Sequence, residues 1–216
     1  MNRSIEDYLK NIYSIKQASG KATTTSLADV LNVSPAAVSE MVSKLSKTGF
    51  IKNTPYKGFD LTKKGEKIAL NLIRKHRLWE VFLVKYLDFP WDKVHEEAEK
   101  LEHVSTDELI SKLEGYMEYP KHDPHGYPIP DENGKIEKDN CVPLTEAKIG
   151  TLKVIKRVSD ESSELLNYLS KIGLRLDDEI KVTDRIEFDN SVQITKNAGK
   201  IFLSEKLAGN IYVANK

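Results

Sequence analysis

The residues best suited to chemistry lie together on one predicted helix. The segment after Pro90 reads WDKVHEEAEKLEHV, and its metal-binding residue types stand at positions i, i+4, i+7 and i+8: His95, Glu99, Glu102 and His103. This spacing puts all four side chains on one helical face. Two imidazoles and two carboxylates on one face suit a divalent metal ion, because without a cation the carboxylates would repel each other. A solvated acidic face explains the same spacing equally well, so the pattern alone leaves both interpretations open.

A second candidate pair lies on the preceding predicted helix. His76 and Glu80 stand four residues apart and therefore share a face. Helical bundles build metal sites from such pairs on facing helices. Taken alone, His76 is more often a core or surface histidine, so this pair supports the metal hypothesis only in combination with the helix after Pro90.

These residues do not complete a metallohydrolase motif. His95-Glu96 begins like HExxH, but the fifth position is Glu99, and Glu99 to His103 lacks the first histidine of HxxEH. Cys141 has no histidine near it in the sequence. We therefore expect a protein that is not an enzyme. A metallohydrolase stays the alternative that a turnover assay would test.

The charge distribution indicates a polyanionic partner for the first third of the chain. The whole sequence is neutral, with 33 basic and 33 acidic residues. Residues 1–75 carry 13 Lys or Arg and 6 Asp or Glu, which gives +7 and leaves −7 for the rest. A basic part on a neutral chain is typical of a domain that meets nucleic acid, although a chance fluctuation would give the same split.

The basic part has the pattern of a winged helix-turn-helix. A helix over about 4–18, with Ser4 as its cap, precedes two short helices over about 25–31 and 35–47 that a tight turn joins. A basic hairpin over about 51–61 would form the wing. We expect the start of the second short helix to face base edges and nearby lysines to contact phosphates. The candidate DNA-binding residues are Ser34, Pro35, Ala36, Ala37, Ser39, Glu40, Lys44, Lys47, Lys52 and Lys57.

Three further helices are predicted after the wing. They cover about 62–88, 91–104 and 105–116, and Ser105 with Glu108 would form a capping box for the last. Their apolar residues offer more surface than three helices can bury alone. This surplus predicts a homodimer interface, with an ordinary core as the competing interpretation.

The fold class that follows is mainly α with a small β part. Residues 119–143 form a predicted loop, and short strands around one helix then predict a small β-barrel. We expect a winged helix-turn-helix domain over 1–73, a helical domain over 74–140 and the barrel over 141–216.

Composition restricts the environment of the chain. No run of about 18 apolar residues exists, and the first residues lack the apolar core of a signal peptide. The single cysteine, Cys141, cannot form an internal disulfide. A cytoplasmic protein is the simplest expectation.

Four stretches together resemble one protein family. EDYLKNIY, the helix-turn-helix with SPAAVSEMV, RKHRLWEVFL and VHEEAEKLEHV are similar to the diphtheria toxin repressor family of metal-dependent transcriptional repressors. The resemblance covers nearly the whole chain and is greatest to the manganese-responsive branch with three domains. It implies an N-terminal winged helix, a helical metal-binding and dimerisation domain, and a C-terminal SH3-like domain of the ferrous transport A type.

The resemblance also implies a primary metal site. Its ligands correspond to Asp7, Glu99, Glu102 and His103, whereas iron-type members have Met and Cys at the places of Asp7 and Glu99. The oxygen-rich set is hard, so it suits Mn²⁺ and accepts Fe²⁺. Two-domain manganese regulators have a Glu where Lys10 stands here, so a two-metal cluster of their kind is not expected.

An ancillary metal site is implied as well. Part of it comes from helices, and three-domain relatives add ligands from the linker and the barrel. The family often has Cys where Asp123 stands. The implied ancillary ligands are His76, Glu80, His95, Asp123, His125 and Asp160.

The expected function is repression of metal-ion uptake genes. The resemblance implies a homodimer that binds a palindromic double-stranded operator when Mn²⁺, or Fe²⁺, joins the DNA-binding and dimerisation domains. The alternative is a winged-helix regulator that responds to a small organic ligand. Chelation discriminates between them, because only the first loses DNA affinity when metal is removed.

Overall fold

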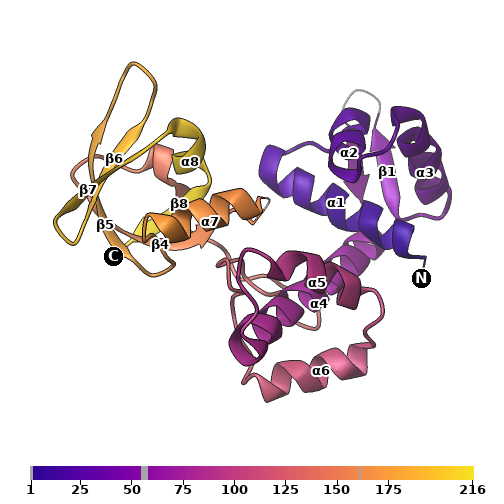
Figure 1. Cartoon of the computed structure of the whole chain (residues 1–216). Helices are drawn as coiled ribbons and strands as arrows, with labels where there is room; N and C mark the ends of the chain where they lie inside the picture. Colours follow the sequence, from indigo (N-terminus) through magenta and orange to yellow (C-terminus); the bar gives the residue numbers. More distant parts are fainter. Residues whose placement is uncertain (1, 55–57, 161) are drawn as a thin grey trace. The chain divides into compact units, whose positions relative to one another are not determined.

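The computed structural model describes residues 2–54, 58–160 and 162–216 (Figure 1). These residues form two compact units. The N-terminal unit contains the chain up to His76 together with 99–111 and 130–136. The C-terminal unit contains Arg77–Ala98, Lys112–Ile129 and Glu137–Lys216.

The N-terminal unit begins with the expected helix-turn-helix and wing. Its elements are α1 (Arg3–Ser19), α2 (Thr24–Leu31), α3 (Pro35–Lys47), β1 (Ile51–Thr54) and β2 (Gly58–Leu61). The strands pair antiparallel, with Ile51 opposite Leu61. Asn32 closes α2 in the left-handed conformation (φ 51°), which gives the tight turn before α3. The helices pack on a buried apolar core that includes Leu9, Ile12, Leu27, Val38 and Leu45.

Helix caps were predicted only in part. Ser34 caps α3 as expected, since its hydroxyl accepts a hydrogen bond from the backbone N–H of Ala37 at 3.2 Å. The prediction for α1 is wrong: Asn2 is the cap, and its side chain accepts from the N–H of Ser4 at 2.9 Å. Helix α2 opens at Thr24, one residue before the predicted start.

Three helices follow the wing, as predicted. They are α4 (Lys63–Leu87), α5 (Val94–Glu102) and α6 (Asp107–Tyr116). The capping residue of α6 is Thr106, whose hydroxyl accepts from the N–H of Leu109, whereas the hydroxyl of Ser105 donates to the carbonyl of Leu101. Helix α5 ends earlier than predicted, so His103 follows it in a turn.

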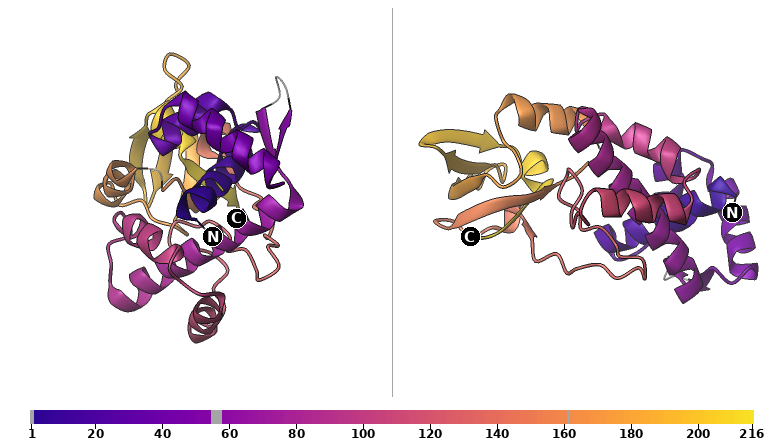
Figure 2. Two further views of the ribbon diagram at one scale, coloured as in Figure 1. Left: turned by 90° about the vertical axis from the view of Figure 1, so that its right-hand side faces the viewer. Right: turned by 90° about the horizontal axis from the view of Figure 1, so that it is seen from below.

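The C-terminal unit contains a six-stranded antiparallel sheet, consistent with the predicted small barrel (Figure 2). Its elements are β3 (Val142–Pro143), β4 (Leu152–Val158), α7 (Ser163–Lys171), β5 (Glu179–Arg185), β6 (Val192–Lys196), β7 (Gly199–Leu203), α8 (Glu205–Gly209) and β8 (Ile211–Asn215). The strand order is β3-β8-β4-β5-β6-β7. Register shifts in β4 and β5 mark bulges, which bend strands. The 3₁₀ helix (Leu144–Glu146) and α8 were not predicted.

The interior of the C-terminal unit is apolar. Alternate residues of the strands face inward, as the period of two requires, and α7 adds Leu166 and Leu169. Among the described residues, no helix combines the length and apolar character needed to cross a membrane.

Candidate metal centres and nucleic-acid interface

The four predicted primary ligands converge in the N-terminal unit. Asp7 comes from α1, Glu99 and Glu102 from the last turn of α5, and His103 from the turn after it. Their ligand atoms all lie within 4.8 Å of one another. His103 Nε2 lies 2.8 Å from Asp7 Oδ1 and 3.3 Å from Glu102 Oε1. The structure therefore brings together residues that are about 90 positions apart in the sequence.

Glu6 orients the imidazole of this group. Its Oε2 lies 2.7 Å from His103 Nδ1, so Nδ1 donates to a carboxylate and Nε2 is left to face Asp7. A metal-binding histidine commonly has its second nitrogen held in this way. The sequence analysis did not identify Glu6, although its position directly before Asp7 was the available signal.

Lys10 also lies in this group, one turn along α1 from Asp7. Its Nζ donates to Glu99 Oε1 at 2.6 Å and to Glu102 Oε2 and Oε1 at 2.8 and 3.0 Å. Only 13% of the Lys10 side chain is exposed, and Glu102 is fully buried. Burial by itself would lower the pKa of Lys10, but the carboxylates of Glu102 and Glu99 outweigh it and raise that pKa.

The donor set of the primary group fits a hard divalent cation. Three carboxylates and one imidazole converge, and oxygen and nitrogen donors of this kind suit Mn²⁺. The pKa of Asp7 is raised, first by burial and then by the charge of Glu99, while His103 acts in the opposite direction. A bound cation would favour the ionised form of all three carboxylates.

A second group of possible ligands lies in the C-terminal unit. Glu80, Asp123 and His125 are all buried, and their ligand atoms lie within 4.8 Å of one another. Among the described residues, Asp123 Oδ2 and His125 Nδ1 have no hydrogen-bond partner, and their printed contacts are longer: Arg77 Nε lies 3.5 Å from Asp123 Oδ2, and Glu80 Oε1 lies 3.8 Å from His125 Nδ1. Buried polar atoms are normally hydrogen-bonded, so these two possible ligand atoms beside the Glu80 carboxylate fit a cation. Asp160 is electrostatically close, since its charge raises the pKa of both Asp123 and His125.

In this second group as well, burial and neighbouring charges together shift the pKa values. Burial raises the pKa of Asp123, and the charge of Glu80 adds to the effect. Burial lowers the pKa of His125, but the carboxylate of Glu80 outweighs it and raises the value to about 9. A cation among these side chains would replace protons that the group otherwise holds.

The loop that carries Asp123 and His125 is held by its own hydrogen bonds. Asp123 Oδ1 accepts from the backbone N–H groups of His125 and Tyr127 at 2.8 and 3.0 Å. His125 Nε2 lies 2.7 Å from the carbonyl oxygen of Trp91, which leaves Nδ1 to face Glu80. Gly126 has φ of 92° and passes so close to the backbone of Lys156 that a side chain there would clash.

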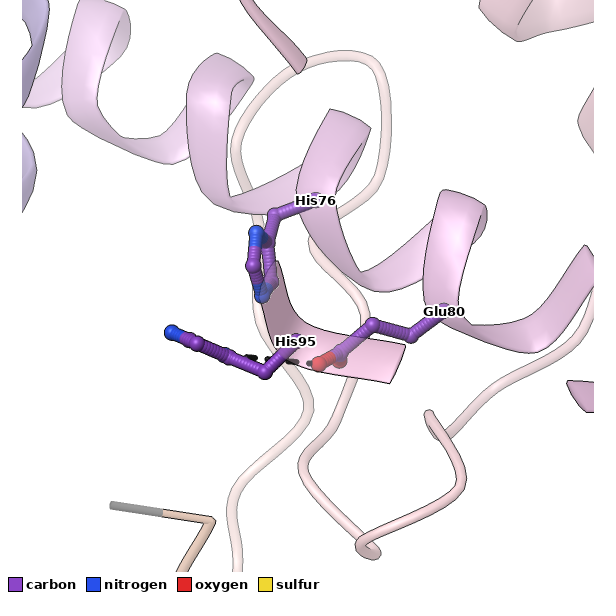
Figure 3. A group of neighbouring side chains, drawn as sticks. All are labelled: His76, Glu80 and His95. Atoms are coloured by element: carbon purple, nitrogen blue, oxygen red, sulfur yellow. Dashed lines mark ion pairs between the residues drawn. The ribbon is translucent and has the colours of Figure 1, made fainter. Parts of the chain in front are cut away.

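The helical part of the predicted ancillary set lies around Glu80 (Figure 3). His95 Nδ1 is 3.6 Å from Glu80 Oε1. His76 stands one turn before Glu80 on α4, and its Nδ1 is 2.6 Å from Glu102 Oε2 of the primary group. Glu80 is therefore close to both His95 and His125, and His76 contacts a predicted primary ligand as well.

The predicted DNA-binding residues form an exposed face of the N-terminal unit. Val38, Val42 and Leu45 point into the core, which leaves the opposite side of α3 in solvent. Lys57 lies outside the described residues. The exposed candidates are Ser34, Pro35, Ala36, Ala37, Ser39, Glu40, Lys44, Lys47 and Lys52.

Three family models match successive parts of the chain. Residues 1–59 match the N-terminal DNA-binding domain of the iron dependent repressors, and residues 62–131 match their metal-binding and dimerisation domain. Residues 142–215 match the FeoA domain. This combination agrees with the winged helix, helical region and β-rich domain that the sequence predicts.

Individual relatives extend this similarity. The chain is 42% identical over 119 residues to an uncharacterized HTH-type transcriptional regulator of Methanocaldococcus jannaschii. The aligned residues cover 55% of this chain and 95% of that relative. It is 27% identical over 222 residues to the diphtheria toxin repressor of Corynebacterium diphtheriae, covering 96% and 95% of the two chains.

A solved structure agrees over almost the full length. A manganese-dependent transcriptional repressor in complex with manganese superposes with a TM-score of 0.92 at 32% identity, covering 98% of this chain and 100% of the other. These similarities give no support to a regulator of small organic ligands. On its sequence, its fold and its relatives, the chain belongs to the diphtheria toxin repressor family of metal-dependent transcriptional repressors.

Proposed function

We propose that this protein is a transcriptional repressor that binds DNA when it holds Mn²⁺ or Fe²⁺, and that it controls genes of metal-ion uptake. The observation that carries the proposal is the convergence of Asp7 with Glu99, Glu102 and His103. Asp7 belongs to the helix that precedes the helix-turn-helix, whereas the other three belong to α5 and the turn after it.

A metal held by these four residues would restrict the first helix. The two positive charges of a bound ion would attract the carboxylates of the group to one point. Asp7 then fixes α1 to the end of α5, and α1 packs against α2 in the same core as α3. Because α3 carries the predicted base-reading residues, metal occupancy and DNA affinity are linked, and each raises the other.

The exposed face of α3 suits the major groove. Ser39 and Glu40 can hydrogen-bond to base edges, while Ala36 and Ala37 offer methyl groups to thymine. Lysines on α3 and β1 would neutralise phosphates and position the helix. We infer that two copies of this face read a palindromic operator, as the symmetry of a homodimer requires.

The homodimer is supported by exposed aromatic side chains in the C-terminal unit. Phe82 stacks on Tyr86 with ring centroids 5.6 Å apart, and Tyr116 lies 5.3 Å from Tyr86. Tyr86 is 43% exposed and Tyr116 is 66% exposed. Aromatic groups gathered on an exposed surface are typical of protein interfaces.

The proposed repressor has a regulatory function and not an enzymatic one. We expect it to act in the cytoplasm, where the DNA is.

The decisive test measures DNA affinity against metal. The protein loaded with Mn²⁺ first selects its operator from a random-sequence DNA library. Affinity for that fragment is then measured anaerobically with Mn²⁺, Fe²⁺, Zn²⁺ or a chelator, for the wild type, Asp7→Asn and Asp29→Asn. Asp29 is exposed on α2 and makes the matched control.

We expect Mn²⁺ or Fe²⁺ to raise the affinity of the wild type and of Asp29→Asn at least tenfold over chelator, and to have little effect on Asp7→Asn. The proposal would be overturned if neither Mn²⁺ nor Fe²⁺ raised the affinity of the wild type over chelator, or if Asp7→Asn responded to the metal as strongly as the wild type.

A further inference from the structure

The ammonium group of Lys10 occupies a position that a cation would take. Its Nζ lies within 3.0 Å of three carboxylate oxygens, one from Glu99 and two from Glu102. The Nδ1 atom of His76 lies 3.4 Å from the same nitrogen. Two carboxylates and an imidazole around one point are donors that a divalent metal would use, but here they surround a side chain of the protein itself.

The contacts of Glu102 show that this position lies beside the primary group. Its Oε2 is held by Lys10 at 2.8 Å and by His76 Nδ1 at 2.6 Å. Its Oε1 lies 3.3 Å from His103 Nε2 and 3.0 Å from Lys10 Nζ. One carboxylate therefore contacts the ammonium with both oxygens, and also reaches His103 with Oε1 and His76 with Oε2.

Charge balance explains why a lysine fits here. The carboxylates that offer ligand atoms to the primary group, or contact the ammonium, are Asp7, Glu99 and Glu102. They carry three negative charges when ionised, of which Lys10 balances one and a single divalent ion balances the other two. The carboxylate of Glu6, which holds His103 Nδ1, adds a fourth negative charge beside them. Even with Glu6 counted, a second divalent ion beside Lys10 would leave an excess of buried positive charge, which is unfavourable.

We propose that Lys10 is a built-in second cation that limits this pocket to one divalent metal ion. The inference rests on the proposed function, because it assumes that the primary group binds metal. It assigns Lys10 an electrostatic role: the ammonium pairs with the carboxylates of Glu99 and Glu102 and occupies the space where a second ion would otherwise bind. The donors left around that space are Glu99, Glu102 and His76.

Replacing Lys10 with a ligand should therefore create a second metal position. Lys10→Glu adds a carboxylate and brings the negative charge of the pocket to four, which two divalent ions would balance. The matched control is Lys16→Glu, which makes the same charge change on the same helix at a side chain that is 45% exposed. Lys10→Gln removes the ammonium without adding a charged ligand.

Equilibrium dialysis gives the number of Mn²⁺ ions bound per full-length chain, and electron paramagnetic resonance gives the spectrum of the bound Mn²⁺. We expect the wild type and Lys16→Glu to give uncoupled Mn²⁺ signals. Lys10→Glu should bind one more Mn²⁺ per chain and give the spectrum of a spin-coupled pair, since Glu99 and Glu102 lie next to both the primary group and the space that the ammonium leaves. Lys10→Gln should bind the same number as the wild type, with at least about tenfold higher affinity, because a positive charge beside the ion is gone.

The outcomes separate this inference from the proposed function. If Glu102→Gln leaves the Mn²⁺ count and spectrum of the wild type unchanged, the primary group does not bind metal and the proposed function fails. If that control succeeds but folded Lys10→Glu binds no additional ion, the role of Lys10 is overturned. A spin-coupled pair in the wild type would also overturn it. If Lys10→Glu does not fold, the comparison of Lys10→Gln with the wild type decides. An Mn²⁺ affinity of Lys10→Gln equal to or below that of the wild type would also overturn the role of Lys10.

Discussion

Removal of the Lys10 ammonium should destabilise the metal-free protein in a way that Mn²⁺ reverses. Lys10→Met keeps a long unbranched side chain but leaves Glu102, which is fully buried, without its ammonium partner. Loss of one partner of a buried ion pair costs about 3–5 kcal/mol. His76 still contacts Glu102 Oε2, and the Glu99 side chain is 32% exposed, so water screens part of the remaining charge. We therefore expect a loss near the lower end, about 3 kcal/mol.

Urea unfolding followed by circular dichroism, with a chelator present, measures this loss. The control is Lys16→Met, which removes a pair with Asp60 whose side chains are 45% and 47% exposed. An exposed pair contributes about 0–1 kcal/mol, so this control should stay close to the wild type. With saturating Mn²⁺, Lys10→Met should regain most of the lost stability, because the ion supplies the missing positive charge.

The reasoning would be refuted by either of two results. One is a metal-free Lys10→Met protein whose free energy of unfolding lies within about 1 kcal/mol of the wild type, as expected for an exposed pair. The other is a large loss that Mn²⁺ fails to reduce relative to the wild type, which would show that Lys10 stabilises the helix packing and not the charges of the pocket.

Three further predictions concern other parts of the chain. Ser34→Ala removes the cap of α3 and should cost about 1 kcal/mol in urea unfolding, with a loss below about 0.3 kcal/mol arguing against the cap. Replacement of Lys44 or Lys52 by Ala should weaken binding to all DNA sequences and lower the salt dependence of binding by about one counterion each; an effect limited to one sequence would contradict a phosphate contact. Burial and the carboxylate of Asp139 raise the pKa of Cys141 from 9.0 to about 12. Alkylation of Cys141 at pH 8 should therefore be about a thousandfold slower than that of the unfolded chain, and an equal rate would contradict this.

The sequence predicted the helices of the N-terminal unit and the common face of two possible metal ligands because both depend on local spacing. The positions of Glu99 and Glu102 on one helical face follow from the period of the helix. The approach of Asp7 to that face could not be obtained from spacing, because it depends on how α1 packs. The resemblance to a family supplied that residue.

What the sequence analysis missed depends on tertiary contacts between distant residues. Lys10 was noted only as a missing ligand, yet its ammonium is held by carboxylates some 90 positions later. Glu6 was missed because nothing local connects it with His103. The cap of α1 was misplaced because Asn2 and Ser4 are both good capping residues, and only the backbone conformation decides between them.

The central claim is that metal binding and DNA binding stabilise the same state of the protein. The most direct test is to measure the Mn²⁺ affinity of the full chain with and without saturating operator DNA, and the operator affinity with and without saturating Mn²⁺. Thermodynamic linkage requires the two ratios to be equal. We predict equal ratios of at least about tenfold, the lower part of the usual range of coupling between sites. An Mn²⁺ affinity that does not change when operator DNA is added would contradict the account.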